Sequence, residues 1–151
     1  MIISNPSEIR KLLDESKVIA VVGMSPNPER DSNKVGKYLM DKGYTVIPVN
    51  PTVNEIYGRK CYPDLSSIPK DIKIDIVDVF RNPEASKEVI KESVKLNPKA
   101  VWLQLGAESK DAIKLALDLG LNIIYGICIM ETHKKLERNE EFFVPDLEKL
   151  S

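Results

Sequence analysis

Val18-Ile-Ala-Val-Val-Gly-Met-Ser-Pro-Asn-Pro-Glu-Arg-Asp-Ser-Asn-Lys-Val-Gly36 is the stretch that decides the fold. Its first five residues form a short apolar run rich in Val and Ile, which is typical of a buried parallel strand. The run stops at Gly23, a polar loop follows, and then Val35, Leu39 and Met40 share one helical face. This order places free N–H groups and the positive end of a helix dipole beside the loop, where they attract an anion. We therefore expect the chain to bind a nucleotide-containing ligand, with its phosphate at this loop.

The rest of the chain repeats the alternation of strand and helix. Apolar runs predict four further strands, over 45–49, 74–79, 100–103 and 122–124. Amphipathic segments predict three helices after the loop, over 34–42, 84–96 and 109–119. This alternation predicts an α/β fold with a doubly wound parallel sheet of about five strands and right-handed crossovers.

The segments outside this alternation are expected to be less regular. A capped helix is predicted to start at residues 4–7. Residues 52–69 are expected to be irregular, with a short extension around 59–61. The tail after Gly126 is mostly polar, and Phe142-Phe143-Val144 is expected to dock it onto the core.

The composition of the whole chain excludes several classes of protein. Its 151 residues are expected to fold as a single domain with a sizeable core. A net charge of −1 with mixed signs does not indicate a nucleic-acid surface. No apolar run approaches the roughly 18–20 residues of a membrane span, and no secretory signal is visible. Cys61 and Cys128 form no CxxC pair and are expected to be free thiols in a cytoplasmic protein.

Candidate binding residues follow from where ligands bind in such sheets, which is beyond the carboxyl ends of the strands. Gly23 and Met24 open the first loop, where a glycine lets the chain turn and a phosphate approach the backbone. The loop then offers donors for phosphate oxygens from Ser25, Arg30, Ser32, Asn33 and Lys34. The alternative is that this polar loop is only a solvated turn.

Two features bear on which nucleotide binds. The GxGxxG fingerprint of dinucleotide-binding loops is absent, because Met-Ser-Pro follows Gly23. NAD-binding sheets usually place a carboxylate for the ribose hydroxyls after the second strand, but this strand ends in Asn50-Pro51. An amide tolerates a phosphorylated ribose better than an acid does, so NAD is disfavoured. The alternative interpretation is an ordinary Asn-Pro turn.

The ends of the third and fourth strands offer further candidates. Phe80 would supply an apolar wall and Arg81 a charge, with core packing and a solvated surface as the alternatives. Gln104 can bond to an amide-rich ligand through both donor and acceptor, and Gly106 permits close approach. Trp102 is expected to belong to the core.

Acidic, thiol and imidazole side chains do not form a pattern that predicts catalysis. Asp75 and Asp78 fall on opposite faces of a strand and are expected to bond to neighbouring loops. Cys128, Glu131 and His133 follow the last strand, but triad partners meet in space rather than in sequence. A metal site would need a second His or a matching Cys cluster. Neither catalysis nor metal binding is expected here.

A succession of short motifs resembles a known family. The motifs are Ile19-Ala-Val-Val-Gly-Met-Ser-Pro26, Ser32-Asn-Lys-Val-Gly-Lys-Tyr-Leu39, Gly43-Tyr-Thr-Val-Ile-Pro-Val-Asn-Pro51, Glu55-Ile-Tyr-Gly58, Tyr62-Pro-Asp-Leu65, Ile68-Pro69 and Val77-Asp-Val-Phe-Arg81. Over about Ser16 to Glu131 the chain is similar to the small stand-alone CoA-binding proteins. Their domain is similar to the N-terminal CoA-binding domain of the succinyl-CoA synthetase alpha subunit. The resemblance implies a Rossmann-like fold that binds coenzyme A.

The resemblance also implies where each part of coenzyme A would lie. The Gly23–Lys34 loop would hold the diphosphate, and Asn50-Pro51 would lie near the adenosine. The pantetheine would be lined by Phe80-Arg81-Asn82 and by Gln104-Leu105-Gly106. The segment from Cys128 to Glu131 also matches a family position. The synthetase's catalytic histidine lies in a different domain, so ligase chemistry is not implied for His133.

Three functions stay open at this point. The leading hypothesis is a single-domain protein over 1–151 that binds coenzyme A or an acyl-CoA and has no chemistry of its own. It would be a monomer or small homo-oligomer, with neither nucleic acid nor membrane as a partner. The second is a CoA-dependent enzyme, or a thiol–disulfide partner of CoA that uses Cys128. The third is an NAD(P)-binding regulatory domain.

Overall fold

The centre of the fold is a five-stranded parallel sheet, seen in a computed structural model that describes residues 1–150. Its strands are β1 (Val18–Val22), β2 (Thr45–Val49), β5 (Ile76–Val79), β6 (Ala100–Leu103) and β7 (Ile123–Tyr125). The order across the sheet is β2-β1-β5-β6-β7, so the chain winds outward from β1 in one direction and from β5 in the other. The predicted doubly wound, Rossmann-like α/β architecture is therefore confirmed.

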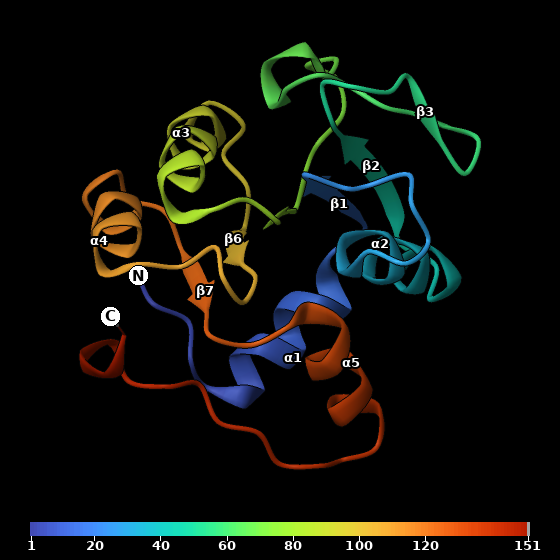
Figure 1. Cartoon of the computed structure of the whole chain (residues 1–151). Helices are drawn as coiled ribbons and strands as arrows, with labels where there is room; N and C mark the ends of the chain where they lie inside the picture. Colours follow the sequence, from blue (N-terminus) through green and yellow to red (C-terminus); the bar gives the residue numbers. More distant parts are fainter. Residues whose placement is uncertain (151) are drawn as a thin grey trace.

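Helices cover both faces of this sheet. The helices α1 (Pro6–Glu15), α2 (Asp31–Asp41) and α5 (Ile129–Glu137) lie on one face, and α3 (Pro83–Val94) and α4 (Lys110–Asp118) lie on the other (Figure 1). Successive residues of a strand point to opposite faces of the sheet because the strand is pleated. In β1, Ile19 and Val21 pack toward α1, α2 and α5, whereas Ala20 and Val22 pack toward α3 and α4.

Three helices begin at side-chain caps. The Asn5 side chain accepts hydrogen bonds from the backbone at the start of α1, as predicted for residues 4–7. Asn82 caps α3 and Ser109 caps α4 in the same way. The start of α2 lies at Asp31, three residues before the predicted Lys34, because its first turn is polar and carries no apolar stripe that a pattern could reveal.

A small hairpin follows β2, where only an extension had been expected. Its strands β3 (Glu55–Ile56) and β4 (Arg59–Lys60) pair antiparallel, and Tyr62 then pairs with the edge of β2. A short 3-10 turn, η1 (Leu65–Ser67), completes the connection to β5. The hairpin lies over the same end of the molecule as the loop after β1 (Figure 1).

The C-terminal segment corrects one expectation. Residues 129–137 form α5, where a mostly polar tail had been predicted. Ile129, Thr132 and Leu136 share one face of this helix and are buried, but so narrow a stripe is inconspicuous among charged neighbours. Beyond α5, Phe142 docks on the core at 7 % exposure, whereas Phe143 is 82 % exposed. A second 3-10 turn, η2 (Leu147–Lys149), ends the described part of the chain.

The helices of residues 1–150 are all too short or too polar to cross a lipid bilayer.

Candidate functional site

Two adjoining hollows open at the carboxyl edge of the sheet. The first, which we term the loop hollow, has a volume of about 510 Å³ and is lined by Gly23, Ser25, Glu29, Arg30, Asp31, Ser32 and Phe80. The second, which we term the thiol hollow, has a volume of about 260 Å³ and is lined by Asp31, Lys34, Val35, Phe80, Gln104, Leu105, Cys128, Met130 and Glu131. Asp31 and Phe80 line both, so the hollows meet at these two residues. Most of the predicted binding residues are thereby brought together.

Gly23 is required by the sheet itself. Its φ is +88°, a conformation that L side chains rarely adopt. A Cβ atom at this position would also collide with the carbonyl oxygen of Phe80, the residue that follows the neighbouring strand β5. The glycine therefore allows β1 and β5 to lie side by side before any ligand is considered, and a Gly23→Val variant would test the fold more than the ligand site.

The polar side chains of the loop hold the loop together. Ser32 Oγ accepts a hydrogen bond from the Ser25 N–H at 2.9 Å, and Ser25 Oγ accepts one from the Asn27 N–H at 3.0 Å. The Asn33 amide donates to the Ser25 carbonyl at 2.8 Å. Because a hydroxyl can accept and donate at once, Ser25 and Ser32 each keep an O–H that can be offered to a ligand. Asn33 serves the loop through its amide group.

The helices that start at the hollows lack side-chain caps. Arg30 at the start of α2 and Cys128 at the start of α5 make no capping hydrogen bond from their side chains. Instead, the Ile129 N–H of α5 donates to Gln104 Oε1 at 3.0 Å. The positive ends of two helix dipoles therefore converge on the hollows, which favours an anionic ligand there.

Charged side chains of both signs surround the hollows. Arg30 and Lys34 are exposed cations, and Asp31 and Glu131 are exposed acids. The acid Asp31 lies in the first turn of α2, where it also interacts favourably with the helix dipole. Glu29 is a further exposed acid at the loop hollow, so a bound anion would have to lie closer to Arg30 and Lys34 than to Glu29 and Asp31.

Asn50 links the end of β2 to the loop. Its amide donates to the Met24 carbonyl at 2.9 Å, and its Oδ1 accepts from the N–H and the hydroxyl of Thr52. The Met24 side chain is fully buried against Gly36 of α2, so only its backbone faces the loop. Pro51 is exposed beside Asn50 and lines neither hollow.

Some of the residues that follow β5 and β6 line the hollows, and others only support the fold. Phe80 lines both hollows, and Leu105, 66 % exposed, lines the thiol hollow. Gln104 lines it too, although its Oε1 is occupied by α5. Arg81, Asn82 and Gly106 line neither hollow: Asn82 caps α3, Arg81 is partly exposed, and Gly106 has a positive φ in a turn with open space beside it. Trp102 is fully buried, as predicted.

Of the three candidate side chains after β7, only the histidine lies apart from the other two. Cys128 is half-buried in the thiol hollow, which Glu131 also lines. His133 lies elsewhere, with its Nδ1 2.7 Å from the Tyr38 hydroxyl. Burial lowers the pKa of His133, and burial raises the pKa of Tyr38 to about 12. No group of three or more metal-ligating side chains occurs among the described residues.

The two acids of β5 differ from each other. Asp75 Oδ2 accepts hydrogen bonds from the N–H groups of Lys17 and Val18, as expected of a bond to a neighbouring segment. Asp78 contradicts that expectation, since neither of its carboxyl oxygens has a hydrogen-bond partner within residues 1–150. It is fully buried, and burial raises the pKa of the Asp78 carboxyl well above its usual range.

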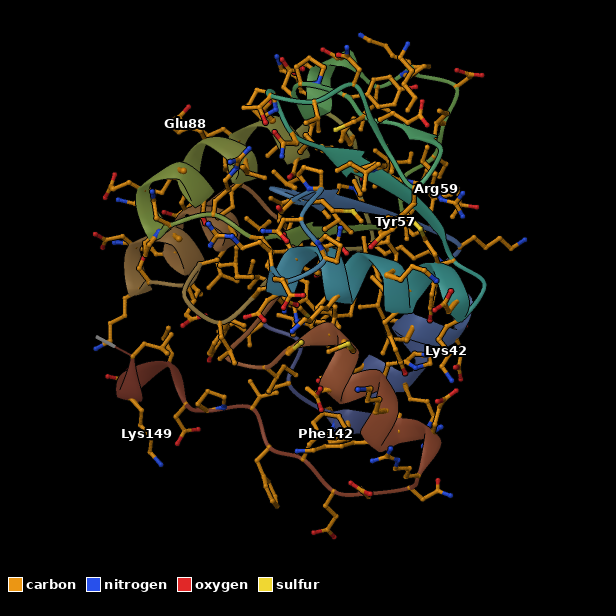
Figure 2. The ribbon with its side chains drawn as sticks, turned by 45° about the vertical axis from the view of Figure 1, so that its right-hand side comes forward. Lys42, Tyr57, Arg59, Glu88, Phe142 and Lys149 are labelled. Atoms are coloured by element: carbon orange, nitrogen blue, oxygen red, sulfur yellow. The ribbon has the colours of Figure 1, made fainter. Side chains whose placement is uncertain are left out.

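One residue beside the site was missed by sequence reasoning. Tyr57, at the tip of the β3–β4 hairpin, donates from its hydroxyl to Asn33 Oδ1 in the first turn of α2. Figure 2 labels Tyr57 and Arg59 on this hairpin, above α2. The Tyr57-Gly58 pair was the available signal, because a tyrosine is an unusual residue for the tip of a tight hairpin.

Known proteins resemble this chain over most of its length. A family model described as a CoA binding domain matches residues 17–134. The uncharacterized protein YneT of Bacillus subtilis is 40% identical over 131 residues, which are 85% of this chain and 96% of that protein. A hypothetical protein from Pyrococcus horikoshii OT3 has a similar structure, with a TM-score of 0.84, 43% identity, and coverage of 88% of this chain and 92% of that one.

A larger enzyme also contains a similar region. The ADP-forming acetate–CoA ligase I of Archaeoglobus fulgidus is 28% identical over 134 residues. The match takes in 83% of this chain but only 20% of the ligase.

Proposed function

The chain belongs to the CoA-binding domain family, and from that premise we propose that it binds coenzyme A or an acyl-CoA at the carboxyl edge of its sheet. The observation that carries the proposal is the pair of adjoining hollows, one polar and flanked by a helix start, the other lined largely by apolar and thiol side chains. Coenzyme A has the same two-part character, with a charged nucleotide and a long, weakly polar pantetheine arm. The protein is proposed to hold this ligand without chemistry of its own.

The diphosphate is assigned to the loop hollow. The uncapped start of α2, the hydroxyls of Ser25 and Ser32, and the cation Arg30 all border this space. Hydrogen bonds from cations to phosphate oxygens are stronger than neutral ones, so Arg30 is expected to contribute most among the side chains.

The pantetheine is assigned to the thiol hollow. Phe80, Leu105 and Met130 offer it apolar contact, and Lys34 borders the end shared with the loop hollow. The adenosine is expected to lie beside Asn50 and Pro51, which places the whole ligand along the ends of four neighbouring strands, β2, β1, β5 and β6. Both cysteines are free, which fits the cytoplasm, where coenzyme A would be available.

Calorimetry with Arg30→Gln tests this placement. Loss of a charge-assisted contact typically costs about 1.5–3 kcal/mol, so the Kd for CoA should rise at least about tenfold. Lys37→Gln is the matched control, because Lys37 lies on α2, the helix that Arg30 precedes, is exposed, and pairs with Asp41 rather than bordering a hollow. Native mass spectrometry of the purified wild-type protein should also reveal a retained ligand of CoA mass. Equal CoA affinities for the two variants and the wild type would refute the placement.

A second candidate function uses the Cys128 thiol, because it borders the hollow assigned to the pantetheine. The Cys128 thiolate would attack one sulfur of CoA disulfide, form a mixed disulfide with one CoA, and release the other as its thiolate. Incubation with CoA disulfide and intact-mass measurement should then detect one CoA adduct that Cys128→Ser removes.

The other cysteine provides the control for this reaction. Cys61 is buried, its Sγ lies 3.5 Å from the Asn50 carbonyl oxygen, and burial raises its pKa, so Cys61→Ser should keep the adduct. A protein that forms no adduct at Cys128 would be a binding protein alone.

A further inference from the structure

Tyr57 occupies a backbone position that does not suit a tyrosine. Its φ is +50°, and Gly58 follows with a φ of +74°. Positive φ at both central residues defines the hairpin turn that favours Asn, Asp and Gly. A bulky side chain in this conformation is uncommon because its Cβ crowds the following carbonyl. The turn by itself therefore gives no reason for a tyrosine here.

The reason lies in what the side chain reaches. The Tyr57 hydroxyl donates to Asn33 Oδ1 at 2.5 Å, across 24 positions of sequence. Asn33 is only 1 % exposed, and its Nδ2 donates in turn to the Ser25 carbonyl at 2.8 Å. The two hydrogen bonds connect the hairpin tip to the loop after β1 through one buried amide.

The same part of the loop is held from two further directions. Asn50 donates to the Met24 carbonyl, and Ser32 Oγ accepts from the Ser25 N–H. The peptide groups at Met24 and Ser25 therefore have three fixed hydrogen bonds, one of which depends on the orientation of Asn33. Tyr57 fixes that orientation, since it occupies the Oδ1 of Asn33 and leaves the Nδ2 directed at Ser25.

We propose that Tyr57 is a positioning residue for the ligand loop, and that it orders residues 24–34 through Asn33 before the ligand arrives. A loop that is already ordered loses less conformational entropy on binding, so affinity rises without any contact between Tyr57 and the ligand. The identity of the ligand rests on the proposed function, but the order of the loop is a property of the free protein.

Tyr57→Phe tests the proposal, because it removes one hydroxyl and keeps the ring. The Kd for CoA, and for ADP as a probe that shares the diphosphate, should each rise by about three- to tenfold, as expected for one hydrogen bond. Hydrogen exchange of the free protein should accelerate at amides 24–34 and stay unchanged in β5 and β6. Tyr62→Phe is the control, since Tyr62 lies on the same connection but its ring contacts the Lys60 ammonium, whereas the hydroxyl on Asn33 comes from Tyr57.

A double-mutant cycle tests the route through Asn33. In an Asn33→Ala background the hydroxyl has no acceptor, so adding Tyr57→Phe should change neither exchange nor affinity further. If Tyr57→Phe lowers the CoA affinity in the Asn33→Ala background as much as it does in the wild type, the proposal is wrong.

The remaining outcomes separate this inference from the proposed function. If Tyr57→Phe leaves the exchange at 24–34 unchanged, accelerates it evenly over the whole chain, or keeps wild-type affinity despite faster local exchange, the inference is wrong. If the wild-type protein binds neither CoA nor ADP, the proposed function fails. Faster local exchange in the free variant would in that case still support the ordering of the loop by Tyr57.

Discussion

At the scale of single residues, Ser25, Ser32 and Asn33 each have a hydrogen bond that belongs to the loop itself. Sequence reasoning selected them as phosphate donors because their side chains are polar and lie before a helix. That reasoning locates the right segment, but it cannot tell a side chain that shapes a loop from one that faces a ligand. The difference depends on partners such as Tyr57, which is 24 residues away from Asn33 and belongs to another element.

The protonation of Asp78 should affect the stability of the fold. In the unfolded chain an aspartate titrates near pH 4, whereas burial raises its pKa well above that in the folded protein. Stability from this group is therefore complete below the unfolded pKa. It falls as the pH rises above that value, because the unfolded state loses its proton first, and the fall continues until the folded carboxyl ionises.

Asp78→Asn should remove this pH dependence, since an amide does not titrate. Relative to the wild type, its free energy of unfolding should increase with pH from about pH 4, by up to about 1.4 kcal/mol per pH unit until the folded carboxyl ionises. Urea unfolding at several pH values between 4 and 8.5 measures the difference. Asp118→Asn, at an exposed position of α4, is the control and should run parallel to the wild type. A constant difference between Asp78→Asn and the wild type over this range would contradict the prediction.

At the scale of elements, the five strands could be predicted from their apolar runs, and the helices α3 and α4 from their apolar stripes. Strand β1, for example, is a continuous apolar run with four of its five residues buried. The pattern of apolar residues does not predict elements that are held by polar contacts. The first turn of α2 is held by Ser32 and Asn33, and the β3–β4 hairpin depends on a turn with an unexpected tyrosine.

The helix α5 was missed for a different reason. Its buried stripe is only Ile129, Thr132 and Leu136, and Lys134 and Lys135 lie between its last two members. Its start is supported by the side chain of Gln104, the residue that follows β6, rather than by a cap of its own. No local pattern reports such a contact across 25 positions. The thiol hollow was therefore only partly predictable, because α5 supplies Met130 and Glu131 to its wall.

At the scale of the whole molecule, the order of the strands brings the residues of the candidate site together. The ends of β2, β1, β5 and β6 are neighbours in the sheet, so four loops distant in sequence meet at one edge. The carboxyl edge could be predicted as the ligand side from the alternation of strands and helices alone. The division of this edge into two hollows could not be predicted, because it depends on where the side chains of Asp31 and Phe80, which line both hollows, lie in the folded chain.

The end of β2 should make this edge prefer CoA over NAD. Asn50 carries an amide where NAD-binding sheets carry an acid for the ribose hydroxyls, and its Oδ1 is occupied by Thr52. CoA has a phosphate on its ribose, which a carboxylate would repel. In competition binding at equal salt, CoA should displace NAD, and tighter binding of NAD would contradict this preference.

Asn50→Asp shows whether the ribose phosphate lies beside this residue. The new carboxylate should lower the affinity for CoA by about fivefold more than the affinity for dephospho-CoA. This ratio corresponds to the roughly 1 kcal/mol expected of two like charges in solvent. The variant also loses the amide that donates to the Met24 carbonyl. Because that loss disturbs the loop, it should lower the affinities for both ligands equally. The ratio of the two affinities therefore isolates the repulsion. Asn54→Asp, at an exposed position of the same connection, should leave this ratio unchanged, and an unchanged ratio in Asn50→Asp would place the adenosine elsewhere on the edge.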